Sequence, residues 1–344
     1  MKNNKIEISS SYLLKFLGIT AGILILLFYG SSLLLPVLFG AFIAVLLQVP
    51  INFLIKKKFP EWLAMLVSVL LMIVIFTALF WFIFAQLSLV AEDWPAIQEK
   101  GSKKLVELSK WLKDDFGINY QNYIGDGQDF FNKIKNIVLQ TLSSFSTVLS
   151  QMFLTLVYII LCLMQKRMFV GFFMRLTTHE VGMSEILSAS AAVIRNYVLG
   201  KGKIMLFLFG IYYAGFALGD VRYALFLALF AALFSIIPYI GNFIGGGIAV
   251  IFSYIFAGTS SAIFVFVVAV IFVTQIIENY VLTPWIVGDD IDLNPFTTIF
   301  GVLLFSTLWG VAGAVISLPV LGVIKVILNH TKGLEAYAYI MKIK

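Results

Sequence analysis

Charged residues are scarce in this chain of 344 residues. Asp, Glu, Lys and Arg together make up 12% of it, while 61% of the residues are apolar and the mean hydropathy is +1.00. Soluble domains contain about 25% charged and about 45–50% apolar residues. So little charge cannot cover a surface that faces water. The composition therefore excludes an ordinary soluble protein and predicts an integral membrane protein.

Cysteine and histidine are nearly absent. The single Cys162 excludes an intramolecular disulfide framework and a cysteine-based zinc site, and His179 and His330 are too few for a histidine-rich metal site. The chain also lacks a P-loop, a His-Glu-x-x-His motif and a Gly-x-Ser-x-Gly motif. We therefore expect no metal, no other cofactor and no enzymatic activity.

The net charge of +6 raises the question of an anionic partner. Lys and Arg are scattered in short segments beside apolar runs, however, and do not form a stripe. We interpret them as topology signals in a lipid bilayer and not as contacts to nucleic acid.

Apolar runs dominate the rest of the chain, and about 20 apolar residues suffice to cross a bilayer as a helix. The runs cover roughly residues 12–35, 36–55, 62–90, 145–165, 204–218, 223–257, 261–283 and 295–328. We predict an all-α integral membrane protein with about eight transmembrane helices, some of them broken or re-entrant.

The distribution of charge divides the chain into three regions. Residues 1–91 form an N-terminal three-span region and residues 145–344 a C-terminal transport region. Between them, residues 92–144 contain eight acids and seven lysines, with apolar residues at helical spacing, which predicts a small helical insert outside the membrane. Residues 179–199 place apolar side chains on one face, which predicts an amphipathic helix at the membrane surface.

Basic residues indicate an orientation. With eight crossings and both termini in the cytoplasm, the cytoplasmic segments carry 16 of the 24 Lys and Arg residues; these segments are 1–15, 56–61, 166–203 and 325–344. The insert then lies outside. A re-entrant hairpin in place of a crossing at 221–257 would invert the orientation of the spans after residue 257.

Glu278 is the one acidic residue within an apolar run. A carboxylate in a span costs at least about 2.5 kcal/mol on insertion scales, which makes such a residue a functional-site hypothesis by default. Thr274, Gln275 and Asn279 are spaced to join it on one helical face, which could bind a cation, accept a proton or contact a polar solute. Alternatively, Glu278 is hydrated near the surface or satisfied by neighbouring helix ends.

Small residues and a proline interrupt the run at 223–257. They are Pro238, Gly241, Asn242, Gly245, Gly246 and Gly247. A missing amide donor, a flexible backbone and one polar side chain are what a discontinuous transporter helix needs. Gly241-x-x-x-Gly245 is equally a pattern for close helix packing.

The last run is too long for one perpendicular crossing. Gly310, Gly313 and Pro319 lie within it, so we expect it to be bent or folded back as a re-entrant hairpin. Pro284 and Gly288 precede it and are further hinge candidates.

The order of these motifs resembles the autoinducer-2 exporter family of bacterial membrane proteins. The resemblance extends over nearly the whole chain and rests on Tyr197-Val198-x-Gly200, Ile237-Pro238-Tyr239-Ile240-Gly241, Glu278-Asn279-Tyr280 followed by Pro284 and Gly288, Leu293-x-Pro295, Gly310-x-x-Gly313 and Leu318-Pro319. It implies an eight-span transporter of the bacterial inner membrane, a homo-oligomer, that moves a small solute. Some members of the family are described as exporters of autoinducer-2 and others as sodium/proton antiporters.

We therefore expect a secondary transporter or exporter of a small polar solute, coupled to protons or to sodium. Glu278 is the expected coupling residue, and the break around residues 235–247 is the expected moving element. Sodium/proton antiport is an alternative. A non-transporting membrane scaffold, in which the insert binds a partner, is an alternative of another class.

Overall fold

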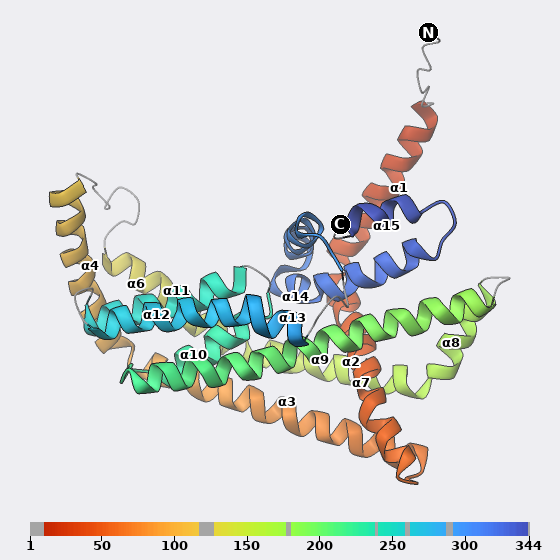
Figure 1. The fold of residues 1–344 in the computed structure, drawn as a ribbon, viewed down its shortest axis with the longest axis horizontal. Coiled ribbons are helices and arrows are strands. Elements are labelled where there is room, and N and C mark those ends of the chain that lie inside the picture. The colour runs from red at the N-terminus through yellow and green to blue at the C-terminus, as the bar shows by residue number, and fades with distance from the viewer. Residues whose placement is uncertain are drawn as a thin grey trace.

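The computed structural model describes residues 10–116, 127–176, 180–237, 240–258, 262–286 and 292–342. Nearly all of these residues are helical, and no β-strand occurs among them apart from an isolated bridge between Leu293 and Lys342. The predicted all-α membrane architecture is confirmed (Figure 1).

The helices follow one another with short connections. In the first half of the chain they are α1 (Ser10–Tyr29), α2 (Ser31–Lys56), α3 (Glu61–Glu92), α4 (Trp94–Phe116), α6 (Gly127–Ser143), α7 (Phe145–Met164) and α8 (Lys166–Arg175). In the second half they are α9 (Glu180–Leu218), α10 (Ala224–Phe234), α11 (Ile240–Ala257), α12 (Ala262–Ile277), the π-helical turn η1 (Glu278–Leu282), α13 (Thr283–Ile286), α14 (Pro295–Asn329) and α15 (Glu335–Met341).

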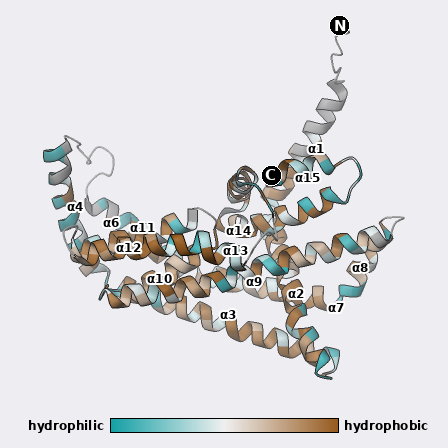
Figure 2. Ribbon diagram, in the orientation of Figure 1, coloured by the Kyte–Doolittle hydropathy of each residue, from teal (hydrophilic) through white to brown (hydrophobic). Residues whose placement is uncertain are grey.

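Hydrocarbon is the solvent for much of this surface. Among the described residues, six helices are long and apolar enough to cross a membrane, and Figure 2 shows apolar residues along them and polar residues gathered on α4 and at helix ends. Large apolar side chains such as Trp81 and Leu206 are exposed, at 70% and 73%. Helices satisfy their backbone hydrogen bonds internally, which is what a lipid environment requires.

Residues 224–257 fold back on themselves. At 11 residues, α10 is about 16 Å long and too short to cross a bilayer. A Cβ atom at Gly245 on α11 would lie 2.6 Å from the Cα atom of Ala231 on α10, and the ring of Tyr223 packs edge-on against that of Phe252. These contacts pair α10 and α11 in antiparallel fashion, and we call them the first hairpin.

Helix α14 folds back as well. Trp309 and Gly310 leave the helical conformation, and Gly310 has a φ of +60°, which glycine adopts without strain. A Cβ atom at Gly301 would overlap Leu321, 20 positions further along the chain. In a straight helix these residues would be about 30 Å apart. Residues 295–308 and 311–329 therefore form the two arms of a second hairpin.

The two hairpins start from opposite ends of the bundle. At the insert end (residues 93–104, 219–223 and 254–258), the Tyr254 hydroxyl donates to the backbone oxygen of Lys104 over 2.9 Å. At the terminal end (residues 292–294 and 325–342), the backbone N–H of Asn294 donates to the backbone oxygen of Met341 over 2.9 Å. Residues 262–286 connect the two ends through about 37 Å of helix.

This arrangement differs from eight simple crossings. Eight crossings would put Gly258 and residues 292–294 on the sides opposite to those observed, because the first hairpin returns to the side from which it starts. The second hairpin also returns to its own side, so the C-terminus keeps its predicted position relative to the insert. The two hairpins by themselves move no basic residue to the other side, since residues 258–261 and 284–294 contain no Lys or Arg.

Two further elements differ from expectation. The predicted surface helix at 179–199 forms the first half of α9, which continues without interruption to Leu218. The runs 12–35 and 36–55, predicted as two crossings, do not fold back on each other. Helix α2 continues away from α1 (Figure 1), and Gly30 keeps helical backbone hydrogen bonds with Leu26, Leu33 and Leu34. Gly200 does not break α9, and Gly30 separates α1 from α2 without reversing the chain.

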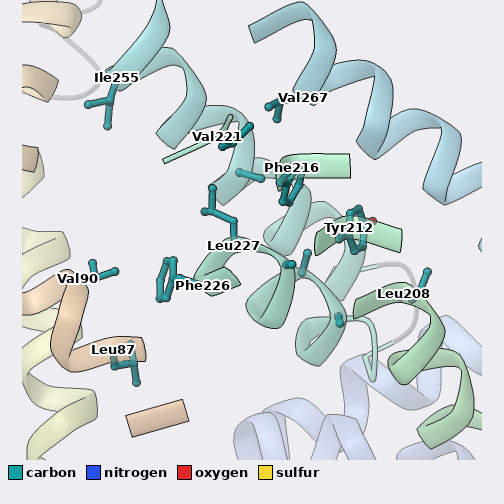
Figure 3. Close-up of a cluster of buried hydrophobic side chains, with 14 of the residues drawn as sticks. Leu87, Val90, Leu208, Tyr212, Phe216, Val221, Phe226, Leu227, Ile255 and Val267 are labelled. Atoms are coloured by element: carbon teal, nitrogen blue, oxygen red, sulfur yellow. The ribbon is translucent and has the colours of Figure 1, made fainter. Parts of the chain in front are cut away.

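The insert packs into the main apolar core. Trp94 and Ile97 of α4 and Phe131 of α6 are at most 3% exposed and belong to the same cluster as Leu87, Val90, Phe226 and Leu227 (Figure 3). Figure 3 also places Tyr212 and Phe216 of α9 in this cluster. The insert is therefore continuous in packing with α3 and the first hairpin, and the division of the chain at residues 91 and 144 stays a prediction.

Candidate functional site

Glu278 lies where α12 ends and is 3% exposed. It opens the π-helical turn η1, in which the regular hydrogen-bond ladder is interrupted. Such turns are rare and occur frequently at functional sites. The hypothesis that Glu278 is hydrated near the surface therefore does not match its position.

Two side chains from distant parts of the chain meet the Glu278 carboxylate. The Lys201 ammonium of α9 lies 3.1 Å from Oε1, and the Asn242 amide of α11 donates to Oε2 over 2.8 Å. The side chain of Lys201 is 12% exposed. A buried carboxylate needs a counter-charge and hydrogen bonds to be stable, and this arrangement provides both.

This network lies deep in the bundle. Lys201 precedes the end of α9 by 17 residues and Glu278 follows the start of α12 by 16 residues, so both are about 25 Å from the insert end. Asn242, the third residue of α11, brings the tip of the first hairpin to the same depth. The site therefore joins a hairpin tip to two long helices.

Two buried polar atoms near the site have no hydrogen-bond partner among the described residues. They are the Oδ1 atom of Asn242 and the hydroxyl of Tyr197, which lies one helical turn before Lys201 on α9. Tyr197 packs in one cluster with Ile237 of the first hairpin and Val302 of the second. The hairpins thus meet beside the network.

Two of the other predicted site residues lie close to Glu278 in the chain, but their side chains donate hydrogen bonds to other groups. The Gln275 amide donates to the Tyr212 hydroxyl over 3.1 Å, and the Thr274 hydroxyl donates to the backbone oxygen of Val270 over 2.7 Å. Thr274 is 1% exposed, and its hydroxyl is used within its own helix.

Asn279 does not join this group. It follows the buried Glu278 directly in η1 and is exposed. The structure buries Thr274 and Glu278 but leaves Asn279 exposed, so the part of Asn279 in the site stays a prediction.

The predicted break residues of the first hairpin have different surroundings. Added Cβ atoms would overlap the Phe234 carbonyl at Gly241 and reach within 2.6 Å of α10 at Gly245 and 3.0 Å of Ile271 at Gly246. At Gly247 nothing lies within 4 Å. Close packing thus accounts for the first three glycines, and their role in movement stays a prediction. Pro238 lies outside the described residues.

The predicted break residues after Glu278 also lie in different surroundings, and only some of them are at a break. Gly310 is at the tip of the second hairpin, and a Cβ atom at Gly313 would overlap the Phe305 carbonyl across it. Pro319 is buried within a continuing helical arm, and Pro284 is an exposed residue of α13. Gly288 lies outside the described residues.

Lys201 and Tyr212 were not predicted as site residues. Lys201 was grouped with the basic residues that flank a span, although Tyr197, Lys201, Ile204, Leu208 and Tyr212 follow a helical repeat. Except for Lys201, all members of this repeat are buried to 6% exposure or less. A lysine within such a repeat is the signal that could have identified the partner of Glu278.

Comparison with known proteins identifies the family of this chain. The family profile described as AI-2E family transporter matches residues 16–333. The chain belongs to the AI-2E transporter family. It is similar to the AI-2 transport protein TqsA of Escherichia coli, with 22% identity over 94% of both chains.

Two further relatives agree with the family. A transport-protein candidate of Haemophilus influenzae is 24% identical over 94% of this chain and 95% of its own length. YueF of Bacillus subtilis, named as a candidate transport protein, is 27% identical over 129 residues, which cover 38% of this chain and 34% of YueF. This AI-2E family member is therefore a multi-pass membrane protein of a transporter family.

Proposed function

We propose that this protein is a secondary transporter that exports a small polar solute of the autoinducer-2 type across the bacterial inner membrane. The buried network of Lys201, Glu278 and Asn242 at a hairpin tip carries the proposal. Broken helices that present polar groups within the membrane are typical of secondary transporters. The name of TqsA supplies the class of solute.

The hydrogen bond from Asn242 to Glu278 attaches the tip of the first hairpin to the end of α12. Protonation of Glu278, or a solute hydroxyl that replaces the Asn242 amide, weakens this attachment, and the tip then separates from α12. Ile237 of the first hairpin belongs to the same buried cluster as Val302 and Leu318 of the second, so a displaced first tip would also disturb the second hairpin. Alternating access through the two hairpins would follow from this contact.

The terminal end would face the cytoplasm. Segments 56–61, 166–203 and 325–344 carry 13 Lys and Arg residues, against eight in 92–144 and 219–223 together. The positive-inside rule then places the insert on the opposite side, and the first hairpin enters the membrane from there.

Flux in proteoliposomes tests the proposal. With autoinducer-2 as the probe, Glu278→Gln should remove most of the flux and its pH dependence, while Glu185→Gln, at an exposed carboxylate of α9, should change neither. Removing one partner of a buried ion pair costs about 3–5 kcal/mol, so the thermal unfolding of each variant must be recorded alongside. Unchanged flux and pH dependence in a folded Glu278→Gln protein would exclude coupling through this carboxylate.

Sodium/proton antiport is a second candidate, because it too requires a buried carboxylate. Liposomes without autoinducer-2 separate the two functions. An antiporter acidifies or alkalises the lumen when sodium is added, whereas a solute exporter leaves the luminal pH unchanged. The insert's burial in the main core gives no support to a scaffold whose insert acts as a separate module.

A further inference from the structure

The oxygen atoms around Glu278 resemble the ligand set of a monovalent metal cation. The carboxylate supplies two oxygens, and Asn242 supplies a buried amide oxygen that has no hydrogen-bond partner among the described residues. Hard cations prefer carboxylate and amide oxygens. In transporters, such sites form where helices are discontinuous.

A positive charge already lies beside the Glu278 carboxylate. The Lys201 ammonium lies 3.1 Å from Oε1 of Glu278, and its side chain is 12% exposed. An ammonium is a compact point charge, comparable in charge to a sodium ion, and it is tethered to α9. The carboxylate is therefore neutralised without any ion from solution.

The charge of the site limits the class of cation. Glu278 is the single carboxylate on the network, and the described residues contain no group of three or more acidic, histidine or cysteine side chains that could hold a metal ion. One negative charge in a low-dielectric environment balances one positive charge. A divalent ion would leave an excess charge buried.

We propose that Glu278 and Asn242 form a monovalent-cation site whose charge this protein balances with its own Lys201 ammonium, so that it needs no sodium ion. The inference rests on the Glu278 site of the proposed function and specifies its coupling. Removal of the ammonium should turn the site into one that binds sodium. If so, sodium/proton antiport through Glu278 is excluded for the unaltered protein.

Sodium-dependent thermal unfolding of the full-length purified protein tests this inference. Unfolding is recorded in sodium chloride and in choline chloride at equal ionic strength. The unaltered protein should unfold at the same temperature in both salts. Lys201→Gln should unfold about 2–4 °C higher in sodium chloride, because an ion that binds the folded state alone stabilises it.

Two variants control for other causes of a shift. Lys203→Gln removes an exposed lysine of the same helix and should behave as the unaltered protein does. The double variant Lys201→Gln/Glu278→Gln has no buried charge to balance and should lose the sodium-specific shift. If Lys201→Gln does not fold in choline, the yield of folded protein in each salt gives the same comparison.

The outcomes separate this inference from the proposed function, since unfolding requires no solute flux. A sodium-specific shift in the unaltered protein would overturn the inference, and so would its absence in Lys201→Gln. Loss of flux in Glu278→Gln without any sodium effect in Lys201→Gln would leave the transporter proposal standing and reject the tethered cation.

Discussion

The indole Nε1 of Trp309 donates a hydrogen bond of 2.8 Å to the backbone oxygen of Leu27. This bond joins the tip of the second hairpin to the last turn of α1, across 282 positions of sequence. The last carbonyls of a helix have no partner within it, so the indole satisfies a group that lipid could not. The tip is thereby fixed to a helix outside the two hairpins.

Trp309→Phe should weaken this attachment. The ring is largely preserved but the donor is lost, which should cost about 0.5–1.5 kcal/mol and lower the unfolding temperature in detergent. Trp81→Phe, at an exposed tryptophan of α3, is the control and should have no effect. Equal unfolding temperatures for both variants would show that the bond does not stabilise the fold.

Gly245→Ala should separate the arms of the first hairpin. The added methyl group would lie 2.6 Å from the Ala231 backbone, and overpacking of this kind costs about 1–3 kcal/mol. Gly247→Ala is a matched control two residues away, because nothing lies within 4 Å of its added methyl group. Alanine favours a helix by up to about 1 kcal/mol over glycine, so this control should be neutral or stabilising. A Gly245→Ala protein as stable as Gly247→Ala would contradict the close contact.

The insert end should lose stability in acid. The Tyr223 hydroxyl donates to the Asp93 carboxylate over 2.6 Å, and together with the Arg222 guanidinium it lowers the pKa of Asp93 below its ordinary value. A lowered carboxyl pKa contributes stability that is fully present above about pH 4 and is lost as the pH falls through the folded-state pKa.

Tyr223→Phe tests this contribution. Without the hydroxyl, the pKa of Asp93 rises toward its ordinary value and the stabilisation above pH 4 becomes smaller. The difference in unfolding temperature between the unaltered and variant proteins should therefore be larger at pH 7 than at pH 3. A difference that is independent of pH would show that the hydroxyl does not act through the charge of Asp93, since the variant keeps the ring that packs against Phe252.

Hydropathy was sufficient to predict the crossing helices but not the hairpins. Helices α3, α7 and α12 match predicted runs, since length and apolarity determine whether a helix can cross. An apolar segment that folds back has the same composition as one that crosses. Whether 224–257 and 295–329 return is decided by contacts such as Gly301 with Leu321, which depend on the folded chain.

Prolines were an uncertain guide to the breaks. Helix α14 continues through Pro319 and breaks at Trp309 and Gly310, where no proline occurs. Neighbouring helices can satisfy the carbonyl groups that a proline leaves free, whereas a reversal requires a residue that tolerates a positive φ. Gly310 is such a residue, but the other glycines in this run remain helical, so glycine alone does not predict the point of reversal.

The site was half predictable from the sequence. Glu278 was found because a charge within an apolar run is costly, and Asn242 because it lies among small residues at a break. Lys201 was missed because its partner is 77 positions away, and because α9 extends past the predicted end of a surface helix. Pairing between distant spans is a property of the folded bundle.

A reversible disulfide tests most directly whether the first hairpin separates from α12 during transport. A Cβ atom at Gly246 would lie 3.0 Å from Cγ2 of Ile271, so cysteines at these positions can be bridged once Cys162 is replaced by Ser. A control pair at Gly215 and Val270 joins α9 to α12, where a Cβ atom would lie 3.4 Å from that of Val270. We predict that oxidation stops autoinducer-2 flux through the first pair, that reductant restores it, and that the control pair transports when oxidised. Undiminished flux through the fully oxidised first pair would contradict the account.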